Sequence, residues 1–228
     1  MNGGKRKSYE NCHVGILHSS HRLHLKMIAQ LWRMNYNVTE INSLIRNRRS
    51  VFPDQLQAGK QVPKEIVQQI LENATWAPNH GHTEPWHFVV FSGAGLKRLS
   101  DFQSEAYKES SGERFKEATY QKLQKNPLLA SHVIALCMKR DPNKKHPEVE
   151  EIAAVACAVE NIYLSVTAYD LGGYWTTGGV TYNPKAKPFF GLGEEDRLLG
   201  FFYLGYVASP SGAGKRKPLE EKVVWVND

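Results

Sequence analysis

The chain has 228 residues, 41% of them hydrophobic, which is enough to close one sizeable core. Its net charge of +6 is uneven, because the first 40 residues hold six Lys or Arg and two acids, and only +2 remains for the rest. A protein that reads DNA places its basic residues on a folded recognition face rather than in a leading tail. The charge therefore disfavours nucleic acid as a partner.

The cysteines and the apolar runs favour an intracellular protein without a membrane span. Cys12, Cys137 and Cys157 form no Cys-x-x-Cys pair, and the latter two lie in apolar runs typical of small buried thiols. No apolar run reaches the roughly 20 residues that a membrane helix needs, because Glu160 and Asn161 interrupt the longest one. We therefore expect a cytoplasmic protein with no membrane contact.

Residues 1–33 differ in composition from the rest, with six basic residues, one acid and four of the nine histidines. They show neither a helical apolar stripe nor the apolar core of a signal peptide. We expect residues 1–33 to be a disordered basic extension, more consistent with sequence upstream of a true start at Met34 than with an organelle presequence. His18, His21 and His24 could bind a metal if this segment were helical, but no acid or cysteine accompanies them, so disorder is preferred.

Taken in chain order, the remaining pattern predicts helices and strands without a strict βαβ alternation. Thr39 is a candidate cap for a helix with Ile41 and Leu44 on its apolar face. A second helix begins at Pro63, and Pro78 stops it. The other expected elements are a buried strand at 86–91, two charged helical stretches, a strand at 131–138, a helix at about 147–171, a short helix at 184–190 and a strand at 198–207.

This order of elements favours an α+β sandwich over a doubly wound parallel sheet, with residues 34–228 as one domain. The helix at 147–171 is apolar on nearly all sides, so it belongs in a core or an interface.

Two basic clusters could bind an anion. Arg48, Arg49 and Ser50 offer two guanidinium groups and a hydroxyl, a set that suits a phosphate. Lys215 and Lys217 lie in a second cluster far along the chain. Taken alone, each cluster is better explained as an ordinary solvated surface, and spacing does not show that the two converge.

A polar turn separates the second helix from the strand at 86–91. Asn79, His80, His82 and Thr83 fall between helix and strand, where their side chains can hydrogen-bond the edge of a heteroaromatic ring. A zinc site formed by His80, His82 and His87 is the alternative. We expect no metal, because His87 lies inside the strand and no carboxylate has clear ligand spacing.

The segment Gly-Gly-Tyr-Trp-Thr-Thr-Gly-Gly at 172–179 is the fourth candidate. Glycines let backbone amides approach a flat ligand closely, although a strand with tight turns has the same composition.

These four segments, in this order, resemble the nitroreductase family of FMN-dependent oxidoreductases, and most of all its small minimal subgroup. The resemblance spans about residues 41–224. It implies an α/β/α sandwich with a central, mostly antiparallel sheet, in an intertwined homodimer whose FMN sites lie at the subunit interface. It also implies that Arg48, Arg49 and Ser50, together with Lys215 and Lys217, surround the phosphate and the ring.

The remaining site residues follow from the same resemblance. The residues implied to reach the flavin from the partner chain are Asn79, His80 and His82. Those implied to contact the isoalloxazine, with one backbone amide near the flavin N5, are Trp175, Thr176 and Thr177. Two positions depart from the pattern, because Phe52 stands where many members carry a basic residue and Trp76 where minimal members can carry an arginine.

The implied activity is the reduction of nitroaromatic, quinone or similar electrophilic acceptors by NAD(P)H. Flavin chemistry needs no side-chain nucleophile, so we predict no catalytic acid or base. Donor and acceptor would use one open site in turn, which implies ping-pong kinetics. The alternatives are a flavin-binding redox sensor without useful turnover, and a relative that performs another flavin step such as enone reduction or dehalogenation.

Overall fold

The structure is a computed structural model that describes residues 36–209 and 211–227. The chain divides into two compact units, residues 1–42 and residues 43–228, so the boundary falls inside helix α2 (Val38–Asn47). The predicted extension at 1–33 and its histidines lie outside the described residues.

The start of helix α2 differs by two residues from the expected one. The Oδ1 atom of Asn37 accepts hydrogen bonds from the backbone N–H groups of Thr39 (3.0 Å) and Glu40 (3.3 Å). Asn37 therefore caps the helix, and Thr39 lies inside its first turn.

The centre of the second unit is a four-stranded sheet with the order β1-β2-β4-β3. Its strands are β1 (Trp86–Ser92), β2 (His132–Met138), β3 (Leu171–Thr176) and β4 (Arg197–Tyr206). All three pairings are antiparallel. Strand β2 is buried throughout, but β1 is an edge strand in which only Phe91 is buried, so the expectation of a buried strand at 86–91 was wrong.

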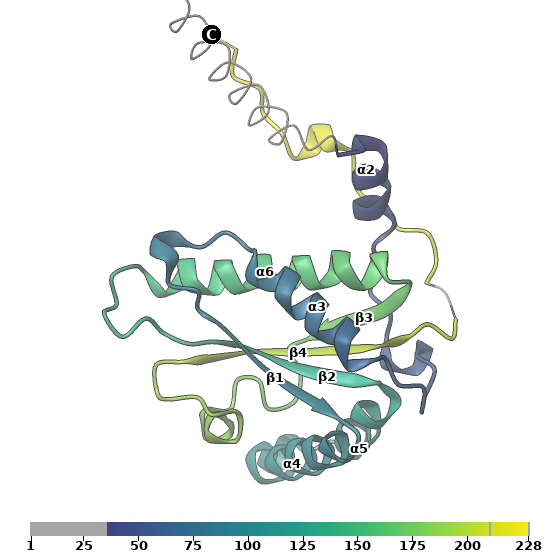
Figure 1. Ribbon diagram of the computed structural model, residues 1–228. Helices are drawn as coiled ribbons and strands as arrows, with labels where there is room; N and C mark the ends of the chain where they lie inside the picture. The colour runs from purple at the N-terminus through teal and green to yellow at the C-terminus, as the bar shows by residue number, and fades with distance from the viewer. Residues whose placement is uncertain (1–35, 210, 228) are drawn as a thin grey trace, which may run out of the picture. The chain divides into compact units, whose positions relative to one another are not determined.

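Helices cover both faces of the sheet (Figure 1). On one face lie α3 (Lys64–Thr75) and α6 (Glu148–Ala168), which pack against the side chains of Ile134 and Phe202. On the other face lie α4 (Ala94–Ser111), α5 (Glu117–Leu129) and the short helix η4 (Pro184–Phe190). Two separate apolar cores result, since neighbouring residues of a strand point to opposite faces. The predicted α/β/α sandwich with an antiparallel sheet is confirmed.

Helix α6 is the one helix among the described residues that is long and apolar enough to cross a membrane. Half of its most apolar stretch is buried against the sheet and α3, as in the core helix of a globular domain. Its apolar character is therefore explained by packing. Of the two thiols expected to be buried, Cys137 of β2 is buried, but Cys157, on the outer side of α6, is exposed.

Two glycines let the segment after α2 pack against the edge strand β3. The backbone N–H of Val51 donates to the carbonyl of Gly173 at 2.9 Å. A methyl group on Gly172 would lie 2.9 Å from Cβ of Val51, and one on Gly173 would lie 2.3 Å from Cζ of Phe202. The space beside these glycines is therefore filled by the protein's own side chains rather than left for a flat ligand.

Replacing Gly173 by alanine should destabilise the fold. The added methyl must displace the fully buried Phe202, so we expect the free energy of unfolding to fall by about 1–3 kcal/mol in urea denaturation. Gly95→Ala is the matched control, because its methyl would meet Phe91 at an ordinary 3.8 Å within α4. Unchanged stability of Gly173→Ala would show that Phe202 can move aside without cost.

A buried histidine should make stability depend on pH. His132 is 6% exposed, and its Nδ1 lies 2.8 Å from the Oγ of Ser131, which accepts the N–H of Val62 at 2.7 Å. Burial lowers the pKa of His132 below its ordinary value of 6.5. Below pH 6.5 His132 therefore binds a proton more readily in the unfolded chain than in the folded one. The free energy of unfolding decreases as the pH is lowered.

We expect the free energy of unfolding to decrease as the pH drops below 6.5, and the slope to become shallower in His132→Gln. His82→Gln, at an exposed position, is the control and should keep the wild-type slope. Urea denaturation at a series of pH values measures both slopes. Equal slopes for wild type and His132→Gln would refute the assignment.

Candidate functional site

The hydroxyl of Tyr163, on α6, joins the segment after α2 to strand β3. It accepts the backbone N–H of Trp175 at 2.8 Å and lies 3.4 Å from the Oγ of Ser50. An isolated parallel bridge between Ser50 and Gly173 holds the same junction. Two of the four segments singled out in the sequence therefore lie side by side.

The two predicted arginines have different environments. The guanidinium of Arg49 donates to the carbonyls of Arg46 (2.6 Å), Arg48 (2.8 Å) and Gly212 (3.3 Å), so its donors are largely used inside the chain. The guanidinium of Arg48 lies 4.9 Å from the centre of the Tyr163 ring and makes no hydrogen bond to any described residue. Arg48 is thus the arginine with free donors.

The C-terminal segment meets this junction, which spacing could not show. The Oγ of Ser211 donates to the carbonyl of Ser50 at 3.0 Å, and a methyl group on Gly214 would lie 2.6 Å from Cζ of Arg49. Lys215 follows directly and is exposed. Lys217 is also exposed and lies 3.9 Å from the carboxylate of Glu221. The backbone before Lys215 therefore approaches the first basic cluster.

At the end of β3, the threonines rather than Trp175 face outward. The indole Nε1 of Trp175 donates to the carbonyl of Leu199 at 2.9 Å, and its ring packs in the core. Since its backbone N–H is bonded to Tyr163, Trp175 has no donor left for a ligand. The backbone N–H of Thr177 makes no hydrogen bond within the described residues, so it is a free amide at the end of β3.

The polar turn is held by contacts within its own chain. The Oδ1 of Asn79 accepts the N–H of Glu84 at 3.0 Å, and the Nδ1 of His80 lies 2.6 Å from Oε2 of Glu150 in the first turn of α6. His82 is exposed, with a left-handed backbone (φ 54°), and makes no side-chain hydrogen bond to any described residue. His82 is therefore the side chain of this turn most open to a partner.

The turn and the basic junction lie far apart along α6. The turn contacts Glu150, whereas the junction contacts Tyr163, thirteen positions later. At 1.5 Å per residue, the two contacts are about 20 Å apart along the helix. Figure 1 shows the segment before β1 near the amino end of α6 and strand β3 near its carboxyl end. One chain therefore does not bring the predicted site together.

One group among the described residues has the composition of a metal site, namely His80, His146 and Glu150, whose ligand atoms lie within 4.8 Å of one another. It differs from the His80, His82 and His87 set considered from the sequence. The Nε2 of His146 is buried without a hydrogen bond and faces Gly81, where a methyl group would lie 2.0 Å away. That nitrogen thus faces backbone. The expectation of no metal stays a prediction.

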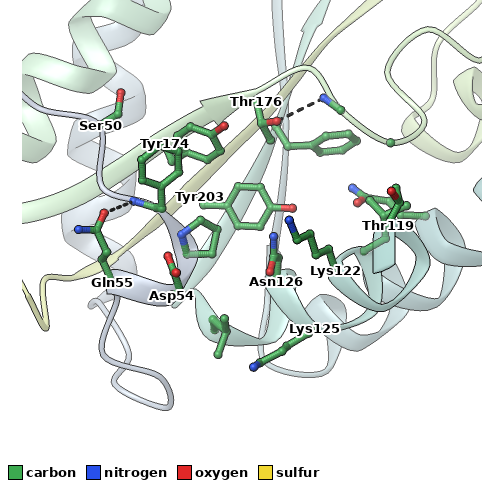
Figure 2. A pocket seen from close by; sticks show the side chains of 18 of the residues that line it. Ser50, Asp54, Gln55, Thr119, Lys122, Lys125, Asn126, Tyr174, Thr176 and Tyr203 are labelled. Atoms are coloured by element: carbon green, nitrogen blue, oxygen red, sulfur yellow. Dashed lines mark hydrogen bonds between the residues drawn. The ribbon is translucent and has the colours of Figure 1, made fainter. Parts of the chain in front are cut away.

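A cavity of about 920 Å³ opens beside the junction (Figure 2). Of the predicted site residues, Ser50 and Thr176 line it; the others do not. Its opposite wall comes from α4 and α5 and includes Gln103, Lys122 and Asn126. Sequence reasoning missed these three, because it treated the charged helices between β1 and β2 as solvent-exposed, and nothing in their spacing separates a pocket wall from a wet surface.

Tyr203 of β4 forms the floor of this cavity and is 4% exposed. Burial, with a smaller contribution from Tyr174, raises the pKa of Tyr203 well above its ordinary value. Its hydroxyl therefore stays protonated at neutral pH and remains a hydrogen-bond donor.

Two known proteins have sequences similar to this chain. YdjA of Escherichia coli K12, provisionally named an NAD(P)H nitroreductase, is 30% identical over 164 residues, which are 71% of this chain and 85% of that protein. Iodotyrosine deiodinase 1 of Homo sapiens is 27% identical over 210 residues, covering 82% of this chain and 68% of that protein.

Solved structures share the fold. A nitroreductase-like family protein from Bacillus cereus is 29% identical, with a TM-score of 0.71, covering 86% of this chain and 99% of that chain. A protein from Desulfovibrio desulfuricans, provisionally named a nitroreductase and solved in complex with FMN, is 22% identical with a TM-score of 0.63; 85% of this chain and 99% of that chain are covered.

The model of the nitroreductase family matches residues 45–206, which include the first basic cluster, the polar turn, every strand of the sheet and most of the cavity lining, but not Ser211 and Gly212 of the tail. The resemblance drawn from the sequence motifs is thus confirmed. This chain belongs to the nitroreductase family and is an oxidoreductase.

Proposed function

We propose that the protein is an FMN-dependent oxidoreductase that uses NAD(P)H to reduce nitroaromatic, quinone or similar electrophilic acceptors. The observation that carries this proposal is the junction itself. Ser50 and Ser211 line a cavity with room for a planar molecule, and the Ser211 hydroxyl ties the lysine-bearing tail to the carbonyl of Ser50. The free guanidinium of Arg48 lies outside this lining, on the ring of Tyr163, whose hydroxyl is 3.4 Å from Ser50. The cavity is within the usual size range for ligand pockets.

The donor set fits the phosphate of FMN. Arg48 offers a planar fork that makes no hydrogen bond to a described residue, Ser50 offers a hydroxyl, and Lys215 adds an exposed positive charge on the adjoining tail. Arg49 instead holds the tail in place through Gly212. In this proposal Arg48 and Ser50 bind the phosphate directly, and Arg49 positions the segment that carries Lys215 and Lys217.

The ring of FMN would lie against the end of β3. Thr176 lines the cavity, and the free amide of Thr177 is the donor best suited to the flavin N5. When bound, FMN supplies hydride transfer between NAD(P)H and the acceptor, so the protein's task is to orient the ring and stabilise negative charge on it. Nicotinamide and acceptor would occupy the one open cavity in turn, which supports ping-pong kinetics.

We further propose a homodimer, because Asn79, His80 and His82 cannot reach the junction of their own chain, about 20 Å away along α6. A second copy can present them there. Two large apolar side chains near the turn are exposed: Trp76 is 81% exposed and Val149 is 68% exposed. Exposed apolar groups gathered on one face commonly mark an interface.

Val149, Ala153 and Cys157 form an exposed stripe along α6. Because they are spaced four positions apart, they share one face of the helix. This face is not needed for the sheet core, whose contacts lie on the other side of the helix. A dimer that buries it would leave the helix covered all round.

The relationship to iodotyrosine deiodinase supports reductive dehalogenation as a second candidate, since it extends over 82% of this chain. Product analysis with a halogenated and a nitrated aromatic separates the two reactions. Tight FMN binding without turnover of either would favour a redox sensor. The cytoplasmic location, the absence of a nucleic-acid partner and the extension at 1–33 stay predictions.

The purified full chain loaded with FMN should lose its visible flavin absorption when NADH or NADPH is added without oxygen. Replacing Arg48 by methionine keeps the stem on Tyr163 but removes the fork, so we expect FMN affinity to fall about 10- to 100-fold. Arg46→Met, at an exposed position whose side chain makes no hydrogen bond to a described residue, is the control. Flavin that stays oxidised with both nicotinamides would refute the proposed function.

A charged substitution on the α6 face should split the dimer. We expect Cys157→Glu to convert the protein from a dimer to a monomer in light scattering, with loss of bound FMN, because a carboxylate would be buried in an apolar contact. Cys157→Ser, which keeps the size of the side chain, should stay dimeric. A monomeric wild type that binds FMN tightly would overturn the argument from α6.

A further inference from the structure

The wall of the cavity opposite Ser50 and Thr176 carries polar groups that no protein residue satisfies. Gln103 of α4 is 1% exposed, and its Nε2 has no hydrogen-bond partner in the described part of the chain. Lys122 and Asn126 of α5 line the same cavity, and neither side chain has a hydrogen bond or ion pair with any described residue. A buried donor without a partner costs free energy, so it calls for a ligand or another explanation.

These groups converge. Figure 2 shows the ends of Lys122, Asn126 and Tyr203 pointing toward one another in the middle of the cavity. Gln103 lies beside them, with its Oε1 3.8 Å from the place of a methyl group on Gly179, another lining residue. Lys122 and Asn126 of α5 and Tyr203 of β4 thus face a common space, whereas Nε2 of Gln103 is closed off behind it.

The chemistry of this set favours an anion. The ammonium group of a lysine can only donate hydrogen bonds, and a protonated tyrosine hydroxyl can donate one. A side-chain amide can donate two more through its NH₂ group. Asp54, the one acid on the lining, belongs to the helix η1 (Pro53–Gln55) on another wall. In Figure 2 it lies away from the end of Lys122. A carboxylate bound between Lys122 and Tyr203 would satisfy several of these donors at once.

The remaining walls are aromatic. The rings of Phe52 and Tyr174 are 4.6 Å apart at the mouth of the cavity, and Phe201 lies on its inner side. Phe52 is the residue that stands where a basic residue occurs in many family members. Its ring gives this wall an apolar surface suited to an aromatic body, so the positive charge for an anionic group comes from α5 instead.

We propose that the wall formed by Lys122, Asn126 and Tyr203 is an anion subsite, and that the acceptor is an aromatic molecule carrying a carboxylate. The redox role of that molecule rests on the proposed function, but its binding does not. This subsite would select the acceptor by charge while the aromatic walls hold its ring near the end of β3.

Benzoate and benzamide, which differ mainly in charge, test the subsite by isothermal titration calorimetry on the full chain loaded with FMN and on the chain as purified. We expect benzoate to bind at least about tenfold more tightly than benzamide. Lys122→Met should remove most of this preference, since Lys122 is exposed at the rim and its loss should not disturb the core. Lys116→Met, which removes an equal charge outside the cavity, should leave the preference unchanged.

Equal binding of the two probes, or a preference that survives Lys122→Met, would overturn the subsite. Asn126→Leu is a second test variant that does not change the net charge. It should lower the affinity for benzoate and leave the affinity for benzamide unchanged. Flavin reduction by NAD(P)H is measured on the same preparations. If it fails while the benzoate preference holds, the proposed function is wrong and the subsite stands; if it succeeds without that preference, the subsite alone is wrong.

Discussion

The close approach of Val51 to the glycine pair of β3 is the contact on which the site depends. Because Gly172 and Gly173 have no side chains, the segment after α2 can bond to the strand edge, and Phe202 can fill the space beneath. Ser50 is thereby carried to Tyr163, and the tail to Ser50. Without this contact, Ser50 and Thr176 would not line one cavity.

Helix α6 separates the basic junction around Ser50 from the polar turn around His80. Its carboxyl half supports the basic junction through Tyr163, and its first turn fixes His80 through Glu150. Because one chain cannot bring its own turn to its own junction, the proposed dimer would complete the site by supplying the turn from the second copy. The exposed stripe that begins at Val149 gives the dimer a physical reason, since covering apolar surface stabilises association.

The cavity combines two kinds of recognition in one space. One side presents the flavin-binding elements proposed here, with Ser50 and Thr176, and the other presents unsatisfied donors from α4 and α5. Phe52 makes its side of the cavity apolar, and the positive charge of the lining comes from Lys122 and Lys125 of α5. Acceptor preference in such a site would depend on the helical wall rather than on the flavin contacts.

Much of the fold follows from the sequence alone, because apolar periodicity and Pro or Gly signals act over short distances: β1, β2 and β4, the helix at 184–190 and the apolar α6 fall near their expected places, whereas β3 was not predicted as a strand. Motif order also identified the family. Tertiary structure decided what depends on contacts between distant residues. It showed that the tail meets Arg49, that the indole of Trp175 is a core group, that β1 is an edge, and that Gln103 and Lys122 face a cavity. Spacing along a chain cannot reveal such contacts, since packing brings those residues together.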